Sequence, residues 1–357
     1  TVLFPSTSPV IATSSALWIY NPKLLVKGQN GKLTMNGKLR VINGTTLNVG
    51  AAVDNFFNLG PNSESVFENA VINVSGSFGV VSPTHVVKVL FDAATLTVGT
   101  AGLYSDTRVV FDLGFSSSTN ATSTASTIII QNANTGTGGD YRTPLGFNIT
   151  GSTVIQNANT GTSGDFRTPI GFNITGSTLQ LGNATTTAAS TFRISGKVPE
   201  LVIDQTHNHT VQLAGVTTFT SSTTIPTGAT LEQNGYTLFL MRDLNITGGT
   251  FNATATGSTL WFGGTAQQTF ANNGTLVDGY IRGLTVLNSS GASPAVVMNN
   301  PVTIATALNL TFGSLGGPGA ITLGNSLVTA TTTVTVVNGN MLTTPTFNPG
   351  TTFNMNY

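Results

Sequence analysis

The chain has 357 residues, of which 13 are basic and 13 acidic, so its formal net charge is zero. Only 7% of its residues are charged, compared with about 25% in an average soluble domain. A neutral chain without a basic stripe lacks the electrostatic footprint of a nucleic-acid-binding protein. The absence of cysteine excludes a fold stapled by disulfides. No apolar run reaches the roughly 20 residues that span a bilayer, so we predict no membrane span.

The residue types that dominate the chain predict an all-β protein. The sequence contains 62 Thr, 34 Asn, 28 Ser and 41 Gly. β-Branched residues such as Thr favour strands, whereas Gly and Asn favour turns. The first residue is Thr rather than Met, which we interpret as a mature or trimmed product of a secreted protein. We therefore expect an extracellular or cell-surface location.

Residues 1–22 contain no charged side chain and form the first predicted segment. Apolar pairs alternate with other residues at Val2 and Phe4 and again at Leu17 and Ile19. This pattern predicts either a capping strand or an extended N-terminal arm that adds to the sheet of a neighbouring subunit. In the second case, these four side chains are candidate assembly residues.

Residues 23–126 form a second predicted segment, an irregular β region. Within it, KLTMNGKLRVINGTTLNV at residues 32–49 alternates apolar and polar side chains. The Asn-Gly pairs at Asn36-Gly37 and Asn43-Gly44 predict tight turns between strands.

Residues 127–182 contain two nearly identical copies of one sequence. The copies are QNANTGTGGDYRTPLGFNITG at residues 131–151 and QNANTGTSGDFRTPIGFNITG at residues 156–176. Each copy shows the period-2 alternation of a strand and the Gly and Asn of turns. Tandem repeats of this length are typical of solenoids. We therefore predict a β-solenoid, or parallel β-helix, in which each coil takes about 25 residues.

Stacked coils place equivalent side chains on top of one another, about 4.8 Å apart. Identical or near-identical residues at the repeat offset then form ladders along the axis. A recent duplication in an unstacked loop is the alternative. The predicted stacking ladder places Phe147 on Phe172, Ile149 on Ile174, and Ile129, Val154 and Leu179 in one row.

Residues 183–357 form the last predicted segment, a continued β-solenoid with a longer repeat. GSTLQLGN at residues 176–183 resembles GSTLWFGG at residues 257–264, which indicates a super-repeat of roughly 80 residues, or three to four coils. No charged side chain follows Arg282. Natural solenoids protect their edges with charges or caps. A longer precursor or a glycan coat would explain this bare edge, but we favour contact with another subunit through Phe347, Phe353 and Tyr357.

The repeat segments carry a resemblance to a known group of proteins. The segments are TTIPTGATLEQNGYTLFL (223–240), GSTLWFGGTAQQTF (257–270), GLTVLNSSGASPAVVMNNPVTIATALNLTFGSL (283–315) and AITLGN (320–325). They resemble the Thr/Asn/Gly-rich repeats of large, secreted, adhesin-like surface proteins of Bacteroidota. The resemblance covers roughly residues 177–325 and implies a β-solenoid at the bacterial surface, exported by the type IX secretion route. The C-terminal sorting domain usual in such proteins is not visible in this sequence.

Few residues suggest catalytic or metal chemistry. Asp140 and Asp165 are one repeat apart, and Arg142 and Arg167 each follow two residues later. We interpret them as a self-neutralising surface or turn network, with structural calcium at Asp140 and Asp165 as a weaker hypothesis. His207 and His209 are separated by one residue, but the spacing suggests no third ligand, so we predict an exposed turn. We therefore predict no catalytic residue, no cofactor and no enzyme activity.

Twelve N-x-S/T sequons occur in the chain, about as many as chance gives at this Asn, Ser and Thr content. Asn148 and Asn173 are candidate glycosylation sites, since the strand alternation points both outward.

Three functions follow, in order of preference. The first is a structural subunit of a secreted bacterial filament at the cell surface or in a biofilm matrix. This homopolymer would be joined by strand addition or end-to-end stacking of solenoids. The second is an adhesin stalk or carbohydrate-binding module that contacts surface or matrix glycans. It requires exposed aromatics on one face, whereas the candidates are scattered in sequence: Trp18, Tyr20, Tyr141, Phe166, Tyr236 and Trp261. The third is a polysaccharide-active β-helix enzyme, which requires Asp140, Asp165, Arg142 and Arg167 to line a groove with a further acid.

Overall fold

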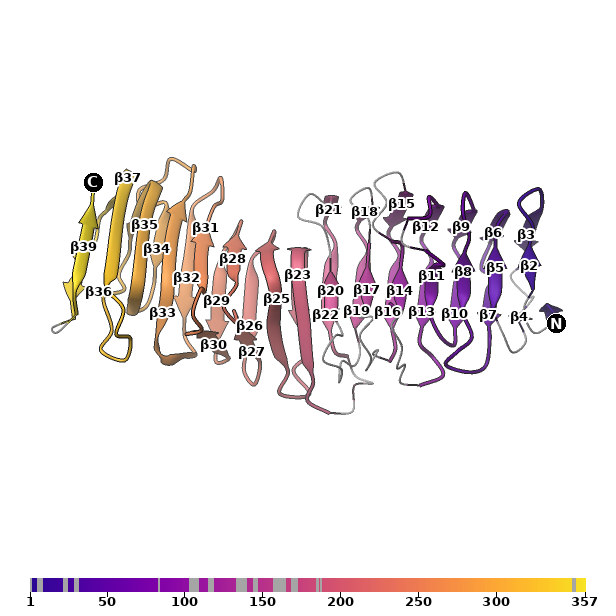
Figure 1. Ribbon diagram of the computed structural model, residues 1–357, viewed down its shortest axis with the longest axis horizontal. Helices are drawn as coiled ribbons and strands as arrows, with labels where there is room; N and C mark the ends of the chain where they lie inside the picture. Colours follow the sequence, from indigo (N-terminus) through magenta and orange to yellow (C-terminus); the bar gives the residue numbers. More distant parts are fainter. Residues whose placement is uncertain are drawn as a thin grey trace. The chain divides into compact units, whose positions relative to one another are not determined.

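The computed structural model describes most of the chain as β-strands joined by short turns (Figure 1). Its described residues contain no helix. The chain divides into two compact units, Thr1–Arg193 and Ile194–Tyr357. The predicted segments 1–22, 23–126 and 127–182 lie in the first unit, and segment 183–357 extends over both. The described residues are 2–4, 9–21, 25–28, 32–82, 84–102, 109–114, 119–132, 140–143, 147–156, 165–167, 173–183, 186, 188–348 and 351–357.

The first unit is a β-solenoid, as predicted. It has three sides, because successive coils each add one strand to three parallel sheets. The first sheet contains β1 (Val2–Phe4), β4 (Leu25–Gly28), β7 (Thr46–Val49), β10 (Val71–Val74), β13 (Thr95–Val98), β16 (Thr127–Ile130), β19 (Thr153–Gln156) and β22 (Thr178–Leu181). The second sheet contains β2 (Val10–Ile11), β5 (Leu33–Met35), β8 (Phe57–Leu59), β11 (Phe78–Val80), β14 (Phe111–Asp112), β17 (Tyr141–Arg142) and β20 (Asp165–Arg167). The third sheet contains β3 (Ala16–Tyr20), β6 (Lys38–Ile42), β9 (Glu64–Glu68), β12 (Lys88–Asp92), β15 (Asn120–Thr124), β18 (Phe147–Thr150) and β21 (Asn173–Thr175).

Alternation along each strand sends every second side chain into the core. In the first sheet, the inward positions form one continuous aliphatic ladder of buried residues, in the order Leu47, Ile72, Leu96, Ile128, Val154 and Leu179. Burying such side chains is the main favourable term that holds the coils together. The predicted turn at Asn43-Gly44 is confirmed, since both residues have positive φ, at 61° and 74°.

The predicted ladder is largely correct, with one error. Ile149 lies beside Ile174, and Val154 beside Leu179, as expected. The prediction for Ile129 is wrong by one position, because the coil from Ile128 to Val154 is one residue longer than the coil from Val154 to Leu179. Ile128 is therefore the buried ladder residue. Phe147 is buried, but its expected partner Phe172 lies outside the described residues.

The second sheet carries an aromatic ladder that the sequence did not predict. Phe57, Phe78, Phe111, Tyr141 and Phe166 are buried one above the other, with ring centroids 4.9, 5.8, 5.1 and 4.7 Å apart. The coil from Phe78 to Phe111 is much longer than the coil from Phe57 to Phe78, so no fixed repeat connects the rungs. Tyr141 and Phe166 are thus core residues and not surface aromatics.

The first described strands belong to the first coil of this solenoid. β1, β2 and β3 pair in parallel with β4, β5 and β6 of the same chain. The described strands of residues 1–22 therefore pair within their own chain.

β23 (Thr191–Val198) crosses the boundary between the units, and the second unit continues with parallel coils of the same kind. Leu238, Leu260, Leu284, Leu308 and Val334 form its longest described aliphatic ladder, and all are buried. Its strands are β24 (Glu200–Ile203), β25 (Thr210–Phe219), β26 (Thr223–Pro226), β27 (Thr230–Glu232), β28 (Thr237–Leu240), β29 (Leu244–Thr247), β30 (Thr250–Ala253), β31 (Thr259–Phe262), β32 (Gln268–Asn272), β33 (Thr275–Leu287), β34 (Val296–Met298), β35 (Val302–Gly316), β36 (Ile321–Leu323), β37 (Thr332–Met341), β38 (Thr346–Phe347) and β39 (Phe353–Asn356).

Candidate functional site

The last coil of the second unit exposes side chains at positions that are core positions one coil earlier. Met355 continues the aliphatic ladder after Val334, yet 41% of Met355 is exposed and only 3% of Val334. Phe347 follows Leu323 in another ladder, and 51% of Phe347 is exposed. Phe353 packs edge-on against Phe347, with ring centroids 5.0 Å apart. We call Phe347, Phe353, Met355 and the exposed Tyr357 the C-terminal face.

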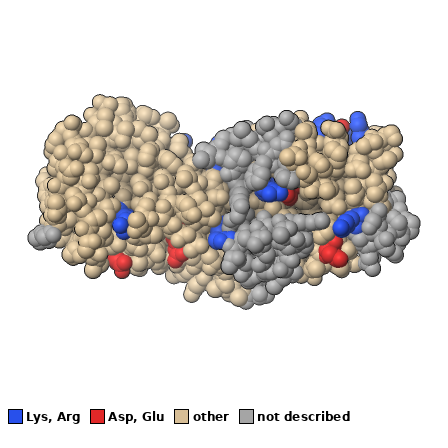
Figure 2. Space-filling view, in the orientation of Figure 1, with Lys and Arg blue, Asp and Glu red and all other residues tan. Residues whose placement is uncertain are grey.

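The C-terminal face also carries open strand edges and no charge. Among the described residues, β39 pairs only with β37, and β38 only with β36. Their outer N–H and C=O groups are therefore available to another strand. Because Arg282 is the last charged residue, the surface of this coil is neutral (Figure 2). A neutral, apolar end with open edges can accept a further coil without burying an unpaired charge.

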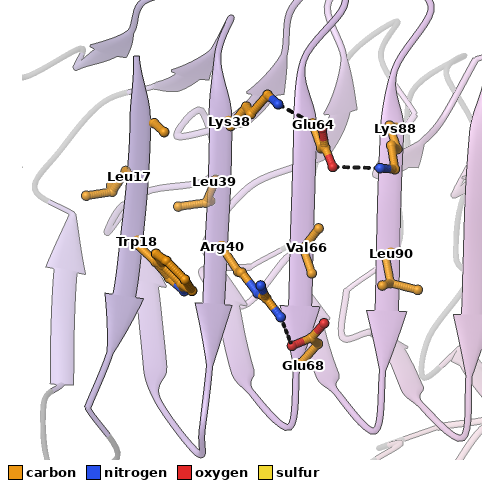
Figure 3. A pocket seen from close by; sticks show the side chains of 11 residues that line it. Leu17, Trp18, Lys38, Leu39, Arg40, Glu64, Val66, Glu68, Lys88 and Leu90 are labelled. Atoms are coloured by element: carbon orange, nitrogen blue, oxygen red, sulfur yellow. Dashed lines mark hydrogen bonds and ion pairs between the residues drawn. The ribbon is translucent and has the colours of Figure 1, made fainter.

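A second candidate site is a shallow groove of about 340 Å³ on the outer face of the third sheet (Figure 3). We call it the N-terminal groove; β3, β6, β9 and β12 supply its side chains. Trp18 is 66% exposed. The Arg40 guanidinium lies 5.4 Å from the centre of the Trp18 ring, and Arg40 Nη2 is 2.7 Å from Glu68 Oε2. Tyr20, on the same face of β3, is exposed to the same degree as Trp18.

Glu64 lies between two lysines at the other end of the groove. Lys88 Nζ donates to Glu64 Oε1 at 2.7 Å, and Lys38 Nζ lies 3.6 Å from Oε2 (Figure 3). The hydrogen bond from Lys88 and the positive charges of both lysines lower the pKa of Glu64 below its usual value. The groove therefore combines an exposed indole with fixed charged groups, an arrangement that suits a ligand with one apolar face and a polar rim.

The structure describes only part of the Asp/Arg network predicted at Asp140, Arg142, Asp165 and Arg167. Asp140 is fully buried, and the side chains of Asp165 and Arg167 lie outside the described residues. Arg142 contacts Asp112 of the preceding coil through two bonds, Nε to Oδ1 at 2.8 Å and Nη2 to Oδ2. This pair could not be predicted from the repeat, because the coil from Asp112 to Arg142 is longer than the repeated coil from Arg142 to Arg167.

The other predicted site residues have mixed positions. Leu17 is half-buried, and Ile19 is buried in the core of the first coil. The side chains of Val2 and Phe4 lie outside the described residues. Asn148 is exposed on β18, as expected, whereas the side chain of Asn173 is not described. The predicted exposed turn at His207 and His209 is wrong for His209, which is fully buried.

Comparison with protein-family models, curated proteins and solved structures finds no match to this chain. Within the part that the structure describes, no helix could cross a lipid bilayer.

Proposed function

We propose that the chain is a structural subunit that assembles end to end into a homopolymeric filament outside the cell. The observation that carries this proposal is the exposure of Phe347 and Met355 at ladder positions whose inner neighbours are buried. Covering these apolar side chains with another coil removes them from water and so stabilises the assembled state.

A second copy of the chain is the occupant that fits this face best. In the first coil, Ile11 lies beside buried Met35 and Leu17 beside buried Leu39, yet both Ile11 and Leu17 are only half-buried. The first described coil thus offers half-covered inward residues on β2 and β3, and the last described coil offers them on β38 and β39. Parallel strand addition between two such ends is a heterologous contact, which builds an open filament when it does not close.

The proposed setting is the surface or matrix of a bacterium, with the chain itself as the main partner. The hydroxyl-rich, cysteine-free composition and the resemblance to secreted Bacteroidota repeats support it. The lack of charge beyond Arg282 supports the chain itself as the partner, because a neutral joint between two copies buries no ion.

Negative-stain electron microscopy of the full chain tests the proposal. We expect fibres from the unchanged chain and short rods from the variants Phe347→Asp and Met355→Asp, which place a charge in the joint. Val81→Asp is the matched control, because Val81 is 59% exposed and belongs to the first unit, whereas the C-terminal face belongs to the second. Short rods from the unchanged chain would contradict the proposal. Deleting residues 1–22 is a poorer test, because it uncovers the second coil and so creates a new open end.

The N-terminal groove favours a second candidate function, an adhesin-type module that binds glycans. The observation behind it is the exposed pair Trp18 and Tyr20 beside Arg40 and Glu68. A glycan array should then show binding that Trp18→Ala removes. The control Trp261→Ala should retain binding, since Trp261 packs edge-on against Phe239 at 4.8 Å in the second unit. No glycan bound by the unchanged chain would reject this candidate.

A further inference from the structure

The loop between β24 and β25 gathers three side chains that can bind a metal ion. Asp204, His207 and His209 each offer one ligand atom, and these atoms all lie within 4.8 Å of one another. The sequence suggested only the two histidines, but Asp204 supplies the third ligand because the loop turns back on itself. Two of the three histidines in the chain lie here.

The distances are close to those of an occupied site. Zn²⁺ binds nitrogen and carboxylate oxygen at about 2.0–2.2 Å, so two ligand atoms of a tetrahedral site lie about 3.4 Å apart. Asp204 Oδ2 and His209 Nε2 are 3.7 Å apart. The His207 and His209 rings are 5.9 Å apart between centroids. Every pair of ligand atoms lies within 4.8 Å, so the side chains need to move closer together to reach the spacing of an occupied tetrahedral site.

Neighbouring contacts hold the three ligands in place. The His209 N–H donates to the His207 carbonyl at 3.0 Å, and the His209 carbonyl accepts from Thr230 N–H of the next coil at 2.9 Å. The Thr206 hydroxyl contacts Asp204 Oδ2 and also lies 3.0 Å from His207 Nδ1. Such outer contacts orient metal ligands and reduce the cost of ordering them on binding.

We propose that Asp204, His207 and His209 form a binding site for a divalent transition-metal ion of the Zn²⁺ type. Two imidazoles and one carboxylate suit Zn²⁺, whereas Ca²⁺ and Mg²⁺ prefer oxygen ligands alone. Three protein ligands leave one coordination position for water. A bound ion would hold the loop between β24 and β25 in one conformation. The proposed metal site is independent of whether the chain forms filaments.

Isothermal titration of the full chain with ZnCl₂ tests the site, using protein without a polyhistidine tag and stripped of metal by a chelator. We expect saturable binding of one ion per chain. Asp204→Asn and His207→Ala should each weaken it by at least about tenfold. These variants are preferred to a change at buried His209, because both side chains are partly exposed. His85→Ala removes the one histidine outside the cluster and should leave the affinity unchanged.

Cobalt(II) absorption gives a second readout that needs no variant. Co²⁺ bound by two imidazoles and a carboxylate in a tetrahedral site produces visible absorption bands, and added Zn²⁺ should bleach them. No saturable Zn²⁺ binding, or equal affinity in the unchanged chain and both cluster variants, would overturn the proposal. A Co²⁺ spectrum of an octahedral hydrated ion would overturn it as well.

Discussion

Phe347 lies beside Leu323 in the parallel register of β38 and β36, one coil further along, yet 51% of Phe347 is exposed and only 1% of Leu323. Both residues occupy the same inward position of the solenoid. The difference is that Leu323 has a coil on each side and Phe347 has one described coil. Comparing substitutions at Leu323 and Phe347 therefore measures how much a covering coil contributes to the stability of a ladder residue.

Leu323→Ala should destabilise the second unit far more than Phe347→Ala does. Truncating a buried leucine costs about 2–5 kcal/mol, because it loses transfer free energy and leaves a cavity. Phe347 is half exposed in the isolated chain, so its truncation should cost clearly less, even though more atoms are removed. Urea denaturation of unassembled chains, followed by circular dichroism, measures both free energies of unfolding.

The two substitutions should rank in the opposite order when their effects on assembly are measured. If a second copy covers Phe347, then Phe347→Ala should weaken assembly more than Leu323→Ala does. The comparison is made under conditions in which both variants are folded to the same extent. Equal effects of the two variants on both measurements would show that Phe347 is covered to the same extent as Leu323.

Tyr141→Phe should stabilise the first unit. The Tyr141 ring stacks between Phe111 and Phe166, and its buried hydroxyl has no hydrogen-bond partner among the described residues. Burial strongly raises the pKa of Tyr141, so the hydroxyl stays neutral at all ordinary pH values. Leaving such a group unsatisfied costs about 1–3 kcal/mol, and phenylalanine removes the cost without a cavity.

The urea midpoint of Tyr141→Phe should therefore rise, with Tyr236→Phe as the control at a tyrosine that is 38% exposed. The second repeat copy already carries Phe166 at the equivalent rung, which is consistent with this expectation. A drop in midpoint would mean that the hydroxyl makes a stabilising contact.

Local alternation and the tandem repeat over residues 131–176 were sufficient to predict the parallel β-solenoid. They also predicted the rungs Ile149–Ile174 and Val154–Leu179, because those coils have equal lengths. Ile129 was misplaced because a single extra residue in the preceding coil moves every side chain to the other face. The aromatic ladder from Phe57 to Phe166 was missed because loops of unequal length change the spacing of its rungs.

The candidate sites were harder to predict, since each is assembled across coils. Arg40 reaches Trp18 and Glu68 only because three separate coils lie side by side. Asp204 joins His207 and His209 only because the loop folds back, which the sequence spacing alone does not specify. Exposure of Met355 depends on the neighbouring coil and not on the residue itself.

Acidification should remove the contribution of Glu64 to stability. Its pKa in the folded chain lies below the ordinary value of 4.5, chiefly because Lys88 donates a hydrogen bond to it. A group with a lowered folded pKa stabilises the fold above its unfolded pKa and loses that effect as the pH falls through the folded pKa. Because water reaches both partners, with 54% of the Lys88 side chain and 28% of the Glu64 side chain exposed, the contribution should stay below about 1 kcal/mol.

Glu64→Gln tests this expectation when its urea midpoint is compared with that of the unchanged chain from neutral to acid pH. The two midpoints should differ at neutral pH and converge below the folded pKa. High salt should also reduce the difference, since it screens exposed charges. A difference that persists in acid would assign the role of Glu64 to packing and not to its charge.

Gly313→Ala should destabilise the second unit, whereas Gly263→Ala should not. Gly313 lies within β35 with φ at +88°, a region that L-residues rarely adopt, and an added Cβ would overlap the carbonyl oxygen of Asn288. The conformation alone costs a residue other than glycine about 1–2 kcal/mol, and the overlap adds to it.

At Gly263, an added Cβ would meet no atom of the described residues within 4 Å, and φ is not positive. Alanine there should be neutral or stabilise by about 0.4–1 kcal/mol through the unfolded chain. Urea denaturation of the two variants separates these cases, and equal midpoints would show that the β35 backbone can relax away from Asn288.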